Sequence, residues 1–152
     1  MPCMFWAPKV MVIHTALACK KIQDFAKDDH CILAGDFNFK PGDASYLVAT
    51  NGSLEESNGQ HPGSDGTEWE PTLAISFESA YKTFNDAEPD FTNYAQIRED
   101  PVFIETLDYI FHSQSLRVTE VLELPHRKDV DGPLPNEEEP SDHIMLGATF
   151  EL

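Results

Sequence analysis

An amphipathic segment that leads directly into a short apolar run constrains the fold of this chain more than any other feature. Residues 8–27 (PKVMVIHTALACKKIQDFAK) repeat apolar side chains three, four or one residues apart, which predicts a helix. The predicted buried face consists of Val10, Ile13, Leu17, Ala18, Ile22 and Phe25. Residues 31–35 (CILAG) are then apolar without interruption, which is typical of a short buried strand. A helix followed at once by a buried strand indicates a mixed α/β chain.

The rest of the sequence adds strands but few helices. We expect a short helix that begins after Asp43 and continues to about Ala49, and another around residues 73–81. Three further strands are expected at residues 104–112, 117–124 and 144–152. Irregular surface segments are expected at residues 51–71, 86–101 and 125–141. Because these helices are too few to cover the strands, we expect the core to lack a partner layer.

Charge and composition limit the classes of function. The formal net charge is -17, from 27 acidic and 10 basic residues, which argues against a broad basic surface for nucleic acid. It is compatible with a narrow site in which a divalent cation neutralises a phosphate. Three cysteines without a C-x-x-C pair predict reduced thiols in an intracellular protein, cytoplasmic or nuclear. No apolar run approaches the roughly 20 residues of a membrane span, so we expect none.

Three polar clusters lie at or near the ends of the predicted strands. They are Gly35-Asp36-Phe37-Asn38, Leu107-Asp108-Tyr109 and Ser141-Asp142-His143. Taken singly, the first is equally well a turn, Asp108 can pair with a neighbouring cation, and His143 can be a partly exposed loop residue. A carboxylate inside an apolar strand needs a partner, however, and a carboxylate is the usual group that orients an imidazole. Catalytic groups also gather at strand ends, where a rigid sheet holds them.

Together the three clusters indicate hydrolysis of a phosphate ester. Oxygen ligands suit Mg²⁺, with Mn²⁺ as the alternative, and such an ion polarises phosphoryl oxygens and stabilises the leaving oxygen. A paired Asp and His can transfer protons or contact the phosphoryl oxygens. An amide such as that of Asn38 can hold an anionic oxygen without adding a repulsive charge.

The motifs GDFN, LDYIF and SDH, in this order and at these separations, resemble the C-terminal half of the endonuclease/exonuclease/phosphatase superfamily. The segment FTNYAQIREDPVFIETLDYIFHS is similar to the deadenylase-like branch, which includes nocturnin, the Angel proteins and the carbon-catabolite-repression deadenylase. The resemblance covers nearly the whole chain. It implies that residues 1–152 form the C-terminal half of a two-sheet α/β (α+β) sandwich of the DNase I-like type, which is incomplete without its N-terminal half.

The resemblance also implies catalytic roles for four residues. Asp36 would orient or deprotonate the attacking water, and Asn38 would contact the scissile phosphate. Asp108 would orient His143, and His143 would bind the phosphate and stabilise the transition state, or act as the general base.

Metal and substrate contacts follow from the same resemblance. Asp142, together with Asp36, would shape the metal site, Asn93 would touch the substrate, and Phe91 would stack on a base. A core position for Phe91 is an equal alternative. The principal metal ligand of the family, a Glu in a Gln-Glu motif, and its early Asn-x-His strand have no match here. We therefore expect the chain alone to be weakly active or inactive.

Three functions remain open from the sequence. The first is a Mg²⁺-dependent phosphodiesterase, a 3′–5′ exoribonuclease of the deadenylase type that acts on RNA. The second is another phosphate-ester hydrolase of the superfamily, either a nucleotide or phosphoinositide phosphatase or a DNA endonuclease. The third is a non-catalytic acidic module that binds a protein partner through residues 51–71 and 125–141. The sequence predicts no particular oligomeric state.

Overall fold

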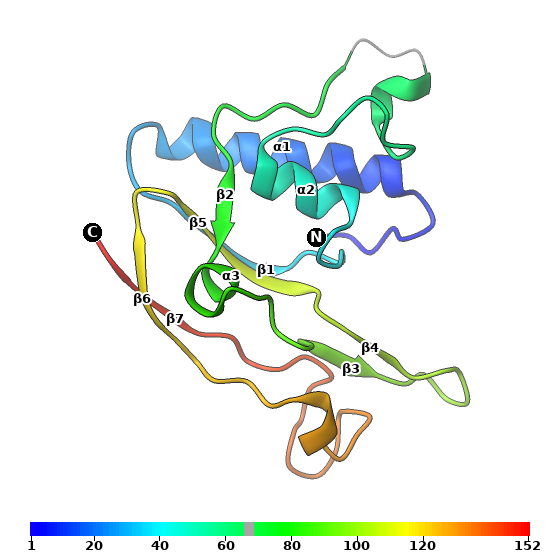
Figure 1. Cartoon of the computed structure of the whole chain (residues 1–152). Helices are drawn as coiled ribbons and strands as arrows, with labels where there is room; N and C mark the ends of the chain where they lie inside the picture. The colour runs from blue at the N-terminus through cyan, green and yellow to red at the C-terminus, as the bar shows by residue number, and fades with distance from the viewer. Residues whose placement is uncertain (66–68) are drawn as a thin grey trace.

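Short antiparallel strands and three helices build this computed structural model, which describes residues 1–65 and 69–152. The helices are α1 (Pro8–Ala26), α2 (Ala44–Asn51) and α3 (Ala80–Asn85), with 3-10 turns η1 (Pro62–Asp65) and η2 (Arg127–Asp129). The strands are β1 (Ile32–Asp36), β2 (Phe77–Ser79), β3 (Asn93–Ala95), β4 (Phe103–Glu105), β5 (Asp108–Ser113), β6 (Arg117–Val121) and β7 (Ala148–Glu151). Within the described residues they form sheets β1–β5–β2, β3–β4 and β6–β7 (Figure 1). The predicted mixed α/β class is confirmed.

Helix α1 matches the predicted helix, but its buried face does not. Leu17 and Phe25, which we expected in the core, are 51% and 82% exposed. The buried residues are Met11, Val12, Thr15, Ala16 and Cys19. Because α1 packs against α2, the adjoining stripe with the smaller side chains faces the neighbouring helix and lets the two helices approach closely.

An aromatic cluster fills the core between α2 and the β1–β5–β2 sheet. Its members are Phe37, Phe39, Tyr46, Tyr109 and Phe111, all buried. The rings of Tyr109 and Phe111 stack with centroids 5.0 Å apart, and Phe37 meets Phe111 edge-on at 5.1 Å. The hydroxyl of Tyr109 also donates to the carbonyl oxygen of Phe39 at 3.0 Å. This packing fixes the end of β1 against the start of β5.

Residues 73–81 do not form the expected helix. Strand β2 occupies residues 77–79, and α3 begins only at Ala80. The side chains of Phe77 and Ser79 are buried on either side of the half-buried Glu78, and β2 pairs with β5. Pairing with a buried strand therefore outweighs the local helical pattern.

The strand expected at residues 104–112 is broken into two. Strand β4 ends at Glu105 and β5 begins at Asp108. Between them, the backbone N–H groups of Leu107 and Asp108 both donate to the side-chain oxygen of Thr92, at 2.9 Å each. This side chain replaces the neighbouring strand as the hydrogen-bond partner. The segment 86–101, expected to be irregular, contains β3, which pairs with β4.

The expectation of few strands and an uncovered sheet is corrected in part. The described residues form seven short strands, and the β6–β7 ribbon covers one end of the first sheet, where the rings of His112 and Phe150 lie 5.2 Å apart. Directly opposite His112 on β1, Ile32 is 46% exposed. On this face of the sheet, β7 therefore covers β5 at His112, whereas β1 is exposed to solvent at Ile32.

The remaining predictions concern loops and spans. Residues 66–68 of the expected loop 51–71 lie outside the described residues, and the described part contains η1. The segment 125–141 is irregular apart from η2. Strands β6 and β7 are shorter than expected. None of the helices in the described ranges is long and apolar enough to cross a membrane.

Candidate functional site

Asp36 and Asp108 lie opposite each other in the β1–β5 ladder. They are Cα partners at the last pair of the antiparallel register, so their side chains emerge on the same face of the sheet. Both residues are partly buried. Like charges placed directly opposite repel each other, so each carboxylate needs hydrogen-bond donors of its own. The structure supplies a different set to each.

Asp36 takes its donors from Asn38. The backbone N–H of Asn38 donates to Asp36 Oδ1 and its side-chain amide to Oδ2, both at 2.8 Å. Asn38 has a positive φ of 54°, which Asn tolerates better than most residues. Buried Phe37 and Phe39 anchor this turn on either side of Asn38. The two interpretations of residues 35–38, a turn and a part of the site, are therefore compatible, because the turn holds the Asp36 carboxylate in place.

The first residue of the chain lies against this turn. The amide of Asn38 donates to the carbonyl oxygen of Met1 at 2.8 Å, and the amino group of Met1 donates to the carbonyl oxygen of Asp36. The segment that precedes α1 is therefore in contact with the Asp36–Asn38 turn.

Asp108 binds His143. The imidazole Nδ1 lies 2.8 Å from Asp108 Oδ2, and the two side chains are 33% and 15% exposed for His143 and Asp108. A carboxylate can accept only from a protonated Nδ1, so this bond orients the ring and leaves its Nε2 edge directed away from Asp108.

Three carboxylates surround this imidazole. Partial burial opposes its positive charge, but the hydrogen bond that the ring donates to Asp108 and the negative charges of Asp108, Asp36 and Asp142 outweigh that effect. As a result, the pKa of His143 lies above its usual value. The site therefore favours an imidazolium, which can donate to an anionic oxygen.

Thr92 is a site residue that the sequence reasoning missed. Its side chain has no exposed surface, and its hydroxyl donates to Asp108 Oδ2 at 2.7 Å. The same hydroxyl oxygen accepts the two backbone N–H groups at the start of β5, so its one donor and two acceptor positions are all used. The carbonyl oxygen of Thr92 accepts the N–H of Ile144, next to His143. Thr92 thus contacts both chain segments that carry the Asp108–His143 pair.

Asn93 holds the segment that carries Asp142. Its amide donates to the carbonyl oxygen of Asp142 at 3.2 Å and to its carboxylate Oδ2 at 3.3 Å. Asn93 also forms an isolated bridge with His143. Because Asn93 is only 4% exposed, this geometry favours a positioning role over the expected contact with substrate.

Phe91 does not have the exposed ring that base stacking requires. It has no exposed surface and meets Tyr94 edge-on, with centroids 5.9 Å apart. The burial of Phe91 favours the alternative of a core residue over the stacking role. On the adjoining strand β4, Phe103 is 44% exposed, so an open aromatic ring lies elsewhere on the same hairpin.

Within the described residues, the acidic side chains offer oxygen donors but do not form a complete set of metal ligands. Asp36 and Asp142 supply carboxylates of the kind that Mg²⁺ prefers, and this ion commonly takes one or two protein carboxylates together with phosphate oxygens and water. Across residues 1–65 and 69–152, no group of three or more His, Cys, Asp and Glu side chains is placed to hold a metal ion. The donor chemistry fits a divalent ion, and the ligand assignment remains a prediction.

A cavity of about 540 Å³ lies apart from these groups. It is lined by residues of α3, of the segment 87–90 and of the segment 121–126, among them Tyr81, Phe84 and Glu88. None of the predicted site residues lines it. The candidate site is therefore separate from this cavity, and its assignment rests on the side-chain hydrogen bonds.

The sequence is similar to a family profile and to known proteins. A sequence profile of the Endonuclease/Exonuclease/phosphatase family matches residues 21–143. Carbon catabolite repressor protein 4 homolog 4 of Arabidopsis thaliana is 40% identical over 127 residues, 80% of this chain and 27% of that protein. The CCR4-Not complex 3′-5′-exoribonuclease subunit Ccr4 of Aspergillus oryzae is 36% identical over 128 residues, 78% of this chain and 16% of that protein.

A solved structure resembles the fold. The crystal structure of ANGEL2, a 2′,3′-cyclic phosphatase, in complex with adenosine-2′,3′-vanadate superposes with a TM-score of 0.71 at 26% identity. The match covers 95% of this chain and 52% of that chain. The chain thus spans about half the length of this solved structure and about a quarter of the Arabidopsis relative.

Proposed function

This chain belongs to the endonuclease/exonuclease/phosphatase family of hydrolytic enzymes, and we propose that it acts on RNA as a 3′–5′ exoribonuclease. The observation that carries the proposal is the hydrogen-bonded Asp108–His143 pair beside Asp36, on one face of the sheet. A relative that is 36% identical is named as a 3′-5′-exoribonuclease subunit, which supports RNA as the substrate class.

In the proposed reaction, Asp36 at the end of β1 acts on the water, and His143, held by Asp108 at the start of β5, acts on the phosphate. A water oxygen attacks the terminal phosphorus, and the carboxylate of Asp36 accepts its proton. The bond between phosphorus and the 3′ oxygen breaks, which releases a nucleoside 5′-monophosphate and leaves a shorter RNA whose 3′ oxygen takes up a proton. The imidazolium of His143 donates to a phosphoryl oxygen. The Asn38 amide exchanges its bond to the carbonyl oxygen of Met1 for one to another phosphoryl oxygen, without adding negative charge.

Members of the family generally depend on a divalent metal ion. Asp36 and Asp142 are the residues of this chain that we propose as its ligands, and the ion would supply charge neutralisation at the phosphate. Because no group of three or more candidate ligands is gathered within the described residues, we propose that the 152-residue chain alone has low activity.

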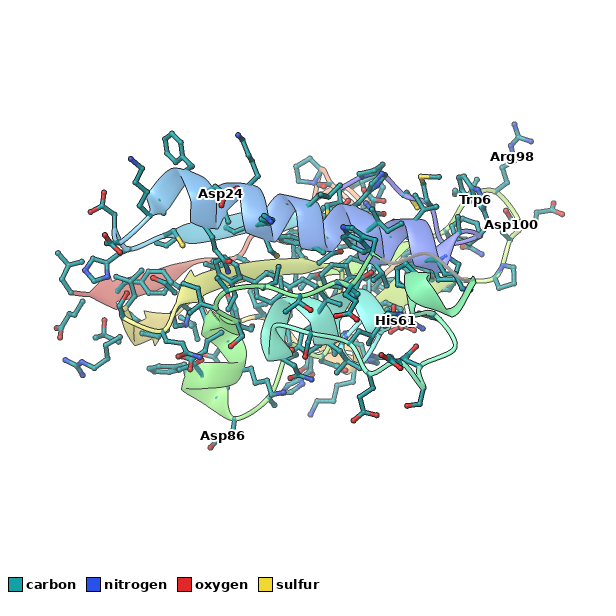
Figure 2. The ribbon with its side chains drawn as sticks, turned by 90° about the horizontal axis from the view of Figure 1, so that it is seen from above. Trp6, Asp24, His61, Asp86, Arg98 and Asp100 are labelled. Carbon is teal, nitrogen blue, oxygen red and sulfur yellow. The ribbon has the colours of Figure 1, made fainter. Side chains whose placement is uncertain are left out.

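A single-turnover assay tests this proposal. The purified chain, in excess over a 5′-labelled oligoadenylate with a free 3′ hydroxyl, is incubated with Mg²⁺ or Mn²⁺, and products are resolved by length. We expect slow, stepwise shortening that Asp36→Asn and His143→Gln each reduce about 100-fold or more. Asp24→Asn, on the outer surface of α1 (Figure 2), is the matched control and leaves the rate unchanged. Equal rates in all four proteins would favour a non-catalytic acidic module instead.

A second candidate function is hydrolysis of a 2′,3′-cyclic phosphate. The solved structure at 26% identity is named as a 2′,3′-cyclic phosphatase, and its ligand is an adenosine-2′,3′-vanadate. The two functions separate in one experiment, in which the same oligoadenylate carries either a 3′ hydroxyl or a 2′,3′-cyclic phosphate. Opening of the cyclic end without shortening of the chain would support the phosphatase and overturn the exonuclease.

A further inference from the structure

An exposed pair of aromatic residues precedes α1. Phe5 is 78% exposed and Trp6 67% exposed, and their rings meet edge-on with centroids 5.1 Å apart. Neither side chain belongs to the hydrophobic core. The contact between the rings fixes each against the other while their remaining faces stay open to solvent. We call Phe5 and Trp6 the aromatic pair.

The aromatic pair is held near the candidate site. At one end of its segment, Met1 contacts Asp36 and Asn38, as described above. At the other end, the N–H of Ala7 donates to the carbonyl oxygen of Met4 at 2.8 Å, and the carbonyl oxygen of Ala7 begins the hydrogen bonding of α1. Five residues span at most roughly 18 Å, so the backbone of Trp6 cannot lie farther than that from Met1.

The figures place this segment at one end of the molecule. The loop before α1 and the tip of the β3–β4 hairpin extend toward the same side in Figure 1. In Figure 2, seen from above, Trp6 again lies at the same end as Arg98 and Asp100, which are in the hairpin tip. Since β3 begins with Asn93, and Met1 contacts Asp36 at the end of β1, the hairpin and the segment of the aromatic pair both start from residues of the candidate site.

The charge of the chain decides what this pair can bind. With a net charge of -17, general attraction of a polyanion to the surface is unfavourable, and broad phosphate contacts cannot supply the affinity. Stacking of bases on aromatic rings needs no positive charge and is a principal means of holding single-stranded nucleic acid. We propose that the aromatic pair is a stacking platform for bases of single-stranded RNA whose 3′ end lies in the candidate site. This inference rests on the proposed function and names how the RNA is held.

Tryptophan fluorescence gives a direct test. The chain has two tryptophans, Trp6 and Trp69, so the Trp69→Phe variant reports on Trp6 alone. Oligoadenylate of ten nucleotides is titrated in the presence of EDTA, which prevents metal-dependent cleavage. We expect saturable quenching of Trp6, and affinity reduced about ten-fold by Trp6→Ala and less by Trp6→Phe when binding is followed by a label on the RNA.

Phe25→Ala is the matched control, because Phe25 is similarly exposed but lies near the C-terminal end of α1, about 25 Å along the helix from its first residue. It should leave the affinity unchanged. Thermal unfolding of each variant should be unchanged as well, since exposed side chains contribute little to stability. Affinity should also fall only slightly as salt is raised, because stacking releases few counterions.

The outcomes separate this inference from the proposed function. Unchanged affinity in Trp6→Ala, absence of quenching or equal losses in Trp6→Ala and Phe25→Ala would overturn the stacking platform, even if the chain shortens RNA. Quenching and a selective loss in Trp6→Ala would support it, even if the chain cleaves nothing and the exonuclease proposal fails.

Discussion

Thr92 and His143 bind the same oxygen of Asp108. The Thr92 hydroxyl lies 2.7 Å from Asp108 Oδ2, and the imidazole Nδ1 of His143 lies 2.8 Å from it. One carboxylate oxygen therefore receives a donor from the residue before β3 and a donor from the segment before β7. The carboxylate that orients the His143 ring is thus itself held by Thr92, a residue with no exposed surface.

Replacing Thr92 tests this dependence. Thr92→Val keeps the shape but removes the hydroxyl, so the backbone N–H groups of Leu107 and Asp108 lose their acceptor. We expect a loss of about 1–3 kcal/mol in the free energy of unfolding, measured with urea. Thr92→Ser keeps the hydroxyl and should recover most of the hydrogen bonding.

The same pair of variants separates positioning from general stability. At a temperature where both are fully folded, Thr92→Val should lower the single-turnover rate on RNA, and Thr92→Ser should restore it. The proton on Nδ1 of His143 should give a downfield NMR resonance in the starting protein and in Thr92→Ser only. If Thr92→Val kept both this resonance and the rate, Thr92 would have no part in positioning the pair.

The sequence predicted the chemical groups of the site better than the packing around them. Asp36, Asn38, Asp108 and His143 stand next to apolar strand residues, and such local contrasts are visible in the sequence. Thr92 is 16 residues from Asp108 and reaches it only because the β3–β4 hairpin folds back, so no local pattern marks it. The exposure of a side chain also depends on the tertiary structure. The sequence alone therefore could not show that the ring of Phe91 is buried.

Two local predictions, the buried face of α1 and the helix at residues 73–81, failed for a related reason although the fold class was correct. On α1 two adjoining stripes are apolar, and the choice between them depends on α2, which lies beyond residue 43. Residues 73–81 carry a local helical pattern, but residues 77–79 form a strand because they pair with β5. In both places the partner, rather than the segment itself, decides the outcome.

His143 should make stability depend on pH. Its pKa is raised in the folded chain by Asp108, Asp36 and Asp142 against the effect of partial burial. A raised folded pKa means that the stabilisation is fully present below the unfolded value, near 6.5, and is lost as pH rises through the folded value. His143→Gln should therefore cost more stability at pH 5.5 than at pH 9, as measured by urea unfolding. An equal cost at both pH values would contradict the raised pKa.

Asp108→Asn examines the cause of that shift. The variant removes the charge that contributes most to holding a proton on the imidazole, so the pKa of His143 should fall. An NMR titration of the ring protons measures it. Asp24→Asn, on the outer surface of α1, changes the net charge equally and is the control, with no change expected. A fall of the same size in both variants would assign the shift to the overall charge of the chain.

Like His143, Glu88 should make the protein less stable as pH rises. Burial raises the pKa of its carboxyl, although the hydroxyls of Tyr46 and Ser79 donate to it and Lys82 lies near. The protein therefore becomes less stable, relative to a variant without this charge, as pH rises through the folded pKa. Comparing the starting protein with Glu88→Gln by thermal unfolding, we expect the difference to shift in favour of the variant between pH 4 and pH 7. A shift in the opposite direction would mean that the three partners outweigh burial.

Gly35 shapes the backbone that presents Asp36. Its φ of +144° is one that residues with a side chain rarely adopt, yet a Cβ there would meet nothing within 4 Å. Gly35→Ala should therefore destabilise the chain by about 1–3 kcal/mol through backbone strain alone. Gly59→Ala is the matched control, since Gly59 has equal space and no such φ, and it should be neutral or slightly stabilising. Urea unfolding measures both, and the RNA assay should show a loss only for Gly35→Ala, because relief of the strain would move Asp36 away from Asp108 and His143.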